Sequence, residues 1–110
     1  MNYEEKLRIT SLIDLYGDLL TEKQRDYLFF YYDQDLSLNE IGENFQISRQ
    51  AVSDNIRRSV QQLENYEEKI GLLKRLNELD NLLIQTEQQV QAPRDLVKQI
   101  RTIMNFERGN

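Results

Sequence analysis

The segment "LSLNEIGENFQISRQAVSDNIRR", residues 36–58, contains the pattern that decides the fold. Ser37 followed three residues later by Glu40 is a capping box, which predicts that a short helix runs over about residues 38–44. Ser48 is a candidate N-cap for a second helix, so only a tight turn fits between the two. Two helices joined in this way are typical of a helix-turn-helix motif.

The apolar residues of this segment recur where such a motif buries its side chains. One falls in the first helix, one on each side of the turn, and two on the inner face of a second helix expected over about residues 49–62: Ile41, Phe45, Ile47, Val52 and Ile56. Gly42 is small where the two helices would cross closely. We expect these apolar residues to form one core with Leu28 and Tyr31.

The rest of the chain also favours helices, so the fold class expected is all-α. Four glycines and one proline in 110 residues leave few breaks, and no alternating apolar and polar run predicts a strand. An amphipathic helix is expected over about residues 3–20. A capping box at Thr21 and Gln24 begins another helix, which is expected to run to about Asp33.

The aromatic run "YLFFYYDQ", residues 27–34, could stack on nucleic-acid bases or pack in the core. On a helical wheel Tyr27, Leu28 and Tyr31 share one face with Tyr32 at its edge, which favours core packing. Phe29 points to the opposite, polar side of its helix and is expected to be exposed.

From Arg49 to about Gln91 the helical pattern is interrupted only by Gly71, so either one long helix or two helices meeting near residues 64–72 are expected. A final helix is expected from about Pro93 to Phe106. The pattern predicts a C-terminal helical hairpin whose two helices face each other through Leu76, Leu79, Leu83 and Val90 on one side and Leu96, Ile100 and Ile103 on the other.

The expected organisation is a helix-turn-helix domain over residues 1–64 and a C-terminal helical extension or hairpin over residues 65–110. A two-helix hairpin cannot enclose all of its apolar residues, since Leu72, Leu73, Leu82 and Ile84 are left at other angles. The chain's own amino-terminal helices, with Phe29 and Phe30, or a second chain must cover them. We expect a homodimer built on residues 72–104, and the alternative is an intramolecular fold-back.

The composition excludes several classes of function. The chain has no cysteine and no histidine, which excludes thiolate and imidazole metal sites, disulfides, and catalysis by a cysteine nucleophile or a histidine base. No carboxylate pair has a partner that would tune it for acid–base chemistry, so neither an enzyme nor a cofactor is expected. No membrane-spanning or signal segment is visible, and a cytoplasmic protein is expected.

The charge distribution points to one nucleic-acid-binding surface. The net charge of −5 disfavours a polyanionic partner, but residues 46–62 carry three arginines against one aspartate, a net charge of +2. First-turn side chains of the second helix would reach base edges in the major groove. The candidate binding residues lie on this outer face: Ser48, Arg49, Gln50, Ser53, Asp54, Arg57 and Arg58.

The stretch "LTEKQRDYLFFYYDQDLSLNEIGENFQISRQAVSDNIRR" also resembles region four of the primary sigma factors, which reads promoter DNA. It is most similar to the YlxM family of small bacterial helix-turn-helix proteins, through "LLTEKQ", "DLSL", "EIGE", "SRQAV" and "DNIRR". The likeness covers residues 7–70 well and the tail only in character. Gly42 stands where the family commonly has alanine, and Ser53 stands where tyrosine is common, which removes a stacking surface.

This resemblance, rather than the residues themselves, implies a role in the signal recognition particle pathway of protein targeting. The implied partners are DNA or the particle's RNA, bound through the second helix of the motif, and the particle's protein. The alternative is a non-enzymatic protein-interaction module that binds a targeting GTPase or another partner through its acidic and leucine-rich helical surfaces. Salt-dependent binding to nucleic acid separates the two readings.

Overall fold

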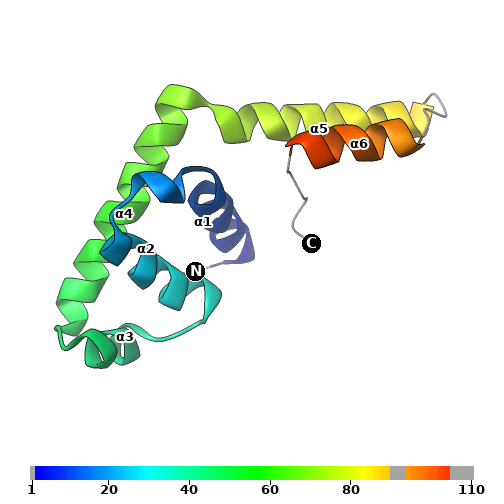
Figure 1. Cartoon of the computed structure of the whole chain (residues 1–110). Coiled ribbons are helices and arrows are strands. Elements are labelled where there is room, and N and C mark those ends of the chain that lie inside the picture. The colour runs from blue at the N-terminus through cyan, green and yellow to red at the C-terminus, as the bar shows by residue number, and fades with distance from the viewer. Residues whose placement is uncertain (1, 90–93, 105–110) are drawn as a thin grey trace. The chain divides into compact units, whose positions relative to one another are not determined.

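The structure, a computed structural model, describes residues 2–89 and 94–104, and every regular element in these residues is helical (Figure 1). This confirms the all-α prediction. The chain divides into two compact units, Met1–Ile70 and Gly71–Asn110, and each is described by itself.

The first unit is a bundle built along α4. Its elements are α1 (Tyr3–Tyr16), the 3₁₀ turn η1 (Gly17–Leu19), α2 (Glu22–Leu28), the π-helical turn η2 (Phe29–Asp33), α3 (Leu38–Phe45) and α4 (Arg49–Ile70). Figure 1 shows α1, α2 and α3 gathered along one side of α4, and all three pack against it. Helices α3 and α4 form the predicted helix-turn-helix.

Both predicted capping boxes are present. The Thr21 hydroxyl accepts a hydrogen bond from the Gln24 N–H at 3.2 Å, and the Gln24 side chain accepts one from the Thr21 N–H at 2.9 Å. Ser37 and Glu40 make the same two bonds, both at 3.1 Å. Because an N-cap contributes about 1 kcal/mol, these local bonds determine where α2 and α3 begin.

The turn between α3 and α4 is tight because of Gly42 and Gln46. Gln46 ends α3 in the left-handed conformation with φ of 58°. The Ile47 N–H then donates to the Gly42 carbonyl at 3.0 Å. A Cβ on Gly42 would lie only 2.7 Å from the Ile47 carbonyl oxygen, so a side chain at this position would push α3 away from the turn.

The core of the first unit lies where α1, α2 and α3 meet α4. As predicted, Leu28, Ile41, Val52 and Ile56 are buried there, and Leu12 and Leu63 join them. Three other residues predicted for this core are only half-buried, at its margin: Tyr31, Phe45 and Ile47.

The margin itself is aromatic. The ring centroid of Phe45 lies 4.9 Å from that of Tyr27 and 5.7 Å from that of Phe30, both edge to face. Phe45 therefore packs on neighbouring rings at the edge of the core, which explains why it is not fully enclosed.

The burial of Tyr31 and Tyr32 differs from the prediction. Tyr32 is buried in the core, whereas Tyr31, which was expected on the core face, is half-buried. The Gln34 N–H donates to the Phe29 carbonyl, five residues back, so Phe29–Asp33 forms a π-helical turn. The wider turn rotates the later side chains relative to an α-helix, and this brings Tyr32 onto the core face. Phe29 is 49% exposed, as predicted.

The second unit contains α5 (Leu72–Gln89) and α6 (Arg94–Met104), which run antiparallel as the predicted hairpin (Figure 1). Of the two expected arrangements, the chain adopts two helices that meet at Gly71, where φ is +70°. This left-handed conformation ends α4 and suits glycine. Pro93, Phe106 and the predicted contact of Val90 lie outside the described residues.

The predicted facing of the hairpin is wrong at three positions, because Leu79, Leu96 and Ile103 are exposed. Leu76 is buried as predicted, and the other buried residues are Leu73 and Asp80 on α5 and Val97 on α6. Leu73, Leu76 and Asp80 share one helix face by their spacing of three and four.

An ion pair inside the hairpin accompanies the different phase. The Asp80 carboxylate, whose residue is 1% exposed, accepts from Arg101 Nε at 3.0 Å. The same guanidinium donates through Nη1 to Glu87 at 3.2 Å. Turning α5 so that Asp80 reaches Arg101 leaves Leu79 at the solvent edge. Among the helices that the structure describes, none combines the length and apolar character needed to cross a bilayer.

Candidate nucleic-acid interface

The candidate interface begins at the amino-terminus of α4, where Ser48 is the helix cap. Its hydroxyl accepts from the Ala51 N–H at 3.0 Å, and its carbonyl accepts from the Val52 N–H at 3.1 Å. Arg49 and Gln50 follow on the first turn, and both are exposed. A helix amino-terminus, whose first-turn N–H groups lack partners within the helix, suits an anionic oxygen.

Asp54 is the centre of a small hydrogen-bonded group on the same face. One carboxylate oxygen accepts from Gln50 Nε2 at 3.0 Å and from Arg57 Nη2 at 3.1 Å. Such an exposed ion pair contributes only about 0–1 kcal/mol, so Arg57 can leave it for a phosphate. The structure thus brings three of the candidate residues into contact.

The remaining candidates differ in exposure. Arg49 and Arg58 are exposed, and neither makes an ion pair with any residue between 2–89 or 94–104. Ser53 is half-buried on the side of α4 that turns toward η2. The exposed cations of this surface are therefore Arg49, Arg57 and Arg58, with one aspartate among them.

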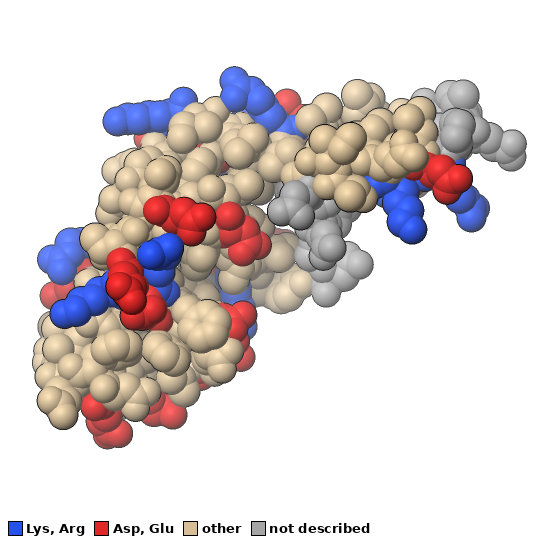
Figure 2. All heavy atoms as spheres, in the orientation of Figure 1, with Lys and Arg blue, Asp and Glu red and all other residues tan. Residues whose placement is uncertain are grey.

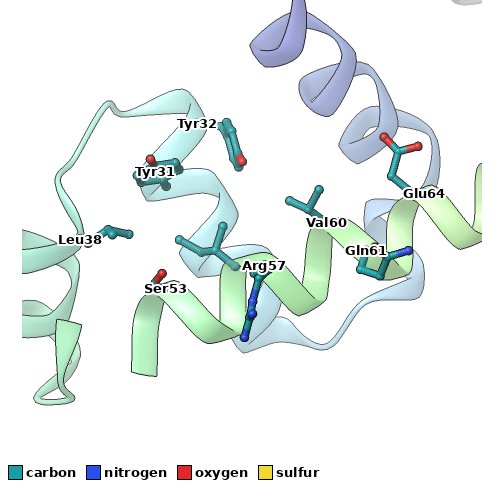
Figure 3. Close-up of a pocket in the computed structure, with 9 residues that line it drawn as sticks. Tyr31, Tyr32, Leu38, Ser53, Arg57, Val60, Gln61 and Glu64 are labelled. Atoms are coloured by element: carbon teal, nitrogen blue, oxygen red, sulfur yellow. The ribbon is translucent and has the colours of Figure 1, made fainter. Parts of the chain in front are cut away.

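A cleft of about 370 Å³ adjoins this face and was not foreseen from the sequence (Figure 3). Figure 3 shows Ser53 and Arg57 on α4, opposite Tyr31 and Tyr32 of η2. The full lining is Tyr31, Tyr32, Leu38, Ser53, Ile56, Arg57, Val60, Gln61 and Glu64. The cleft combines an apolar floor with a cationic edge, a combination typical of sites that receive an apolar group attached to an anion.

Two polar side chains of the cleft are Tyr32, which is protonated, and Glu64, which is held in an ion pair. Burial, followed by the charges of Tyr31 and Glu5, raises the pKa of Tyr32 to about 12, so its hydroxyl stays protonated at neutral pH. Glu64 accepts two bonds from the Arg8 guanidinium of α1, at 2.9 and 2.7 Å. Glu64 is thereby held by α1, and the cation that lines the cleft is Arg57.

Comparison with known proteins agrees with this geometry. The family model described as "Putative helix-turn-helix protein, YlxM / p13 like" matches residues 3–103. The chain belongs to this YlxM / p13-like family, named UPF0122. That family is described as one of helix-turn-helix proteins.

Relatives of the same family cover nearly the whole chain. A UPF0122 protein of Listeria monocytogenes serovar 1/2a is 44% identical over 99 residues, which is 90% of each chain. A UPF0122 protein of an Exiguobacterium species is 44% identical over 107 residues, 97% of this chain and 100% of the relative. One of Bacillus cereus strain AH187 is 42% identical over 101 residues, 92% of each chain.

In the first unit of this YlxM / p13-like chain, a net positive charge is found at residues 46–62. Figure 2 shows acidic and basic side chains interspersed over one face of the first unit, with no continuous basic surface. Residues 1–45 hold ten acidic and four basic side chains, whereas three arginines stand at the start of α4. A polyanion would therefore be attracted to the outer face of α4 and repelled by the rest of the unit.

Proposed function

We propose that the protein is a nucleic-acid-binding regulatory factor that binds DNA or RNA through the outer face of α4. The observation that carries the proposal is the helix-turn-helix geometry, which leaves Arg49, Arg57 and Arg58 exposed on its second helix. The proposed contact residues are Ser48, Arg49, Gln50, Ser53, Asp54, Arg57 and Arg58. Membership of a helix-turn-helix family supports this function.

The proposed roles follow from the chemistry of each group. Arg49 would bond guanine edges or a phosphate, and Gln50 would bond adenine or a backbone oxygen. Arg57 and Arg58 suit phosphates. Asp54 restrains Gln50 and Arg57 and repels phosphate, so these contacts would give weak binding that falls as the salt concentration rises.

The double variant Arg49→Ala with Arg57→Ala should weaken nucleic-acid binding and leave the melting temperature nearly unchanged, because exposed substitutions usually shift stability by under about 0.5 kcal/mol. Each lost phosphate contact should lower the slope of log affinity against log salt by about 0.7–0.9. Gel shifts and anisotropy titrations at several salt concentrations measure both quantities.

The matched control is Lys23→Ala with Lys69→Ala, which removes two exposed positive charges elsewhere in the first unit. Its net charge equals that of the arginine variant. Equal loss of binding in the two variants would mean that only net charge matters, and unchanged binding in the arginine variant would favour the protein-interaction alternative.

For the biological context, we propose the signal recognition particle pathway, which the family resemblance implies. The particle's RNA and its protein are the partners to examine first, and such a role lies in the cytoplasm. A pull-down from cell extract, with bound RNA and bound protein identified separately, tests this assignment. Recovery of neither component would argue against it and leave DNA as the nucleic acid to examine.

We also propose that the helix-turn-helix domain is followed by a C-terminal helical extension that forms a homodimer. The apolar residues exposed on the hairpin are Leu72, Leu79, Leu82, Leu96 and Ile103. When each helix is viewed along its axis from its amino-terminus, these exposed residues lie counter-clockwise from the buried residues of the same helix. This holds for both α5 and α6. Because α5 and α6 run antiparallel, both edges open on the same side of the hairpin, where a second copy would cover them.

Sedimentation equilibrium should show a concentration-dependent dimer of the 13.2 kDa chain at tens of micromolar. The substitution Leu79→Glu should shift it to monomer, because it places a charge on the apolar side. The control is Asn77→Glu, which adds the same charge at an exposed position of the same helix. A wild-type protein that stays monomeric would refute the dimer.

The second candidate function is a protein-interaction module. The observation that favours it is the same apolar side of the hairpin, which would then receive a different protein instead of a second copy. In that case binding to nucleic acid would be absent at low salt, and the pull-down would recover a protein without RNA.

A further inference from the structure

A second cleft, of about 270 Å³, lies between α1 and the α2–η2 segment, and no α4 residue lines it. Thr10, Ile13 and Asp14 line one wall, at helical spacings of three and four. Leu28, Phe29 and Asp33 lie on the other wall. Two helical ridges with a hollow between them form the kind of groove that receives an amphipathic helix.

The floor of this groove is apolar, and one of its rims is aromatic. Leu28 and Tyr32 are buried beneath it, and Ile13 is half-buried. Phe29 stands at the rim with half of its surface exposed, and its ring rests edge-on against Phe30 at a centroid distance of 5.5 Å. A phenylalanine held in this way next to an apolar floor offers a ready contact for an apolar side chain.

The charges around the groove are unbalanced. Asp14 and Asp33 stand on opposite walls. Arg25, the cation of the lining, pairs with Asp18 at 3.3 Å, an exposed contact that it can leave as readily as Arg57 leaves Asp54. Asp33 accepts a hydrogen bond from the neutral side-chain amide of Gln34 at 2.7 Å. The lining therefore holds two carboxylates and one guanidinium, a net charge of −1.

Of the two carboxylates, Asp14 gives the stronger indication of a cationic ligand. It makes no hydrogen bond or ion pair within the described residues; its side chain is exposed at the rim, and the desolvation of its carboxyl group raises the pKa. A carboxylate that loses water without gaining a partner is destabilised, and an approaching ammonium or guanidinium group relieves that loss. The same carboxylates repel phosphate, so the groove disfavours nucleic acid and anionic membranes.

We propose that this groove binds a basic amphipathic segment of a partner protein. An apolar side chain of the partner enters against Phe29, Leu28 and Tyr32, and flanking lysines or arginines pair with Asp14 and Asp33. The site is separate from the α4 surface, so the protein has one face for nucleic acid and another for a cationic protein segment.

The test uses the full chain and a fluorescent synthetic helical peptide of about 15 residues, with leucine and phenylalanine on one face and lysines beside them. Anisotropy titrations should show saturable binding. Phe29→Ala should weaken it at least about tenfold, since a central aromatic anchor carries much of the binding energy. Asp14→Asn with Asp33→Asn should weaken it and flatten its salt dependence, while Tyr3→Ala, another exposed aromatic, should leave it unchanged.

Two control peptides, and measurements of self-association and nucleic-acid binding by the Phe29→Ala variant, test the alternatives. Replacing the peptide's apolar residues by serine, or its lysines by glutamate, should abolish binding, and equal binding of the serine peptide would reduce the effect to non-specific charge attraction and overturn the proposal. A loss of self-association in Phe29→Ala would assign the groove to a second copy and also overturn it. Weaker nucleic-acid binding by Phe29→Ala would assign it to nucleic acid. Because the double asparagine variant is nearly isosteric, it keeps the test valid if Phe29→Ala misfolds.

Discussion

Replacing Ile56 with alanine should lower the free energy of unfolding of the first unit by about 2–5 kcal/mol. Ile56 is 6% exposed and lies on the inner face of α4, in the core formed with α2 and α3. The truncation removes buried apolar surface and leaves a void. Ile56 also lines the 370 Å³ cleft beside the outer face of α4. Water can therefore enter part of the void, so we expect a loss in the lower half of this range.

This loss is large for a small unit, whose total stability is about 5–15 kcal/mol. The melting temperature followed by circular dichroism should fall by roughly 10–25 °C, since each kcal/mol shifts it by about 4–8 °C at this size. The control is Leu19→Ala, which removes the same number of carbon atoms from an exposed side chain. A melting temperature within a degree or two of wild type for Ile56→Ala would show that this residue does not support the core.

The parts of the fold that could be predicted from the sequence depend on neighbours in the chain. The capping boxes at Thr21 and Ser37 form between residues three apart, so their sequence pattern suffices to locate the helix starts. Gly71 ends α4 for an equally local reason, a left-handed backbone conformation that glycine adopts readily. Whether the helix would kink or stop there could not be decided from the pattern alone.

The errors arose where helix phase depends on a tertiary partner. Tyr31 and Tyr32 exchanged roles because η2 is a π-helical turn, and a helical wheel assumes a uniform α-helical period. In the hairpin, leucine spacing favoured Leu79 as an inward residue, but Asp80 occupies that position because Arg101 pairs with it. A hydrophobic pattern gives no weight to a buried carboxylate whose partner lies on another helix.

The contacts among the candidate residues could have been predicted from their spacing, but the adjoining cleft could not. Asp54 was identified as an acidic group among the binding residues, and its bonds to Gln50 and Arg57 follow the spacings of four and three at which helical side chains meet. That rule would have found them. The adjoining cleft had no such signal, because Tyr31 and Leu38 approach α4 only through the folding of η2 and α3 against it.

The second large effect is expected in the hairpin. Arg101→Ala should destabilise the α5–α6 pair by about 3 kcal/mol, near the lower end of the 3–5 kcal/mol typical when one partner of a buried ion pair is removed. The lower end applies because the Arg101 side chain is 31% exposed, whereas the Asp80 side chain is 2% exposed. The variant withdraws the guanidinium from a carboxylate that stays in the interior. Hydrogen exchange should show faster exchange across residues 72–89 and 94–104, with the core of the first unit unchanged.

Two companion variants separate the ion pair from simple loss of side-chain contacts. Lys98→Ala shortens an exposed basic side chain of the same helix and should leave exchange in the hairpin as in wild type. Asp80→Leu combined with Arg101→Leu removes both charges, and because apolar replacement of a buried pair is often neutral or stabilising, it should recover most of the protection lost in Arg101→Ala. If the double leucine variant were as unstable as Arg101→Ala, we would conclude that the hairpin needs the hydrogen bonds between Asp80 and Arg101 and that apolar contacts cannot replace them. If Arg101→Ala itself left exchange unchanged, the Asp80 carboxylate would not depend on the guanidinium, and the phase of α5 would need another cause.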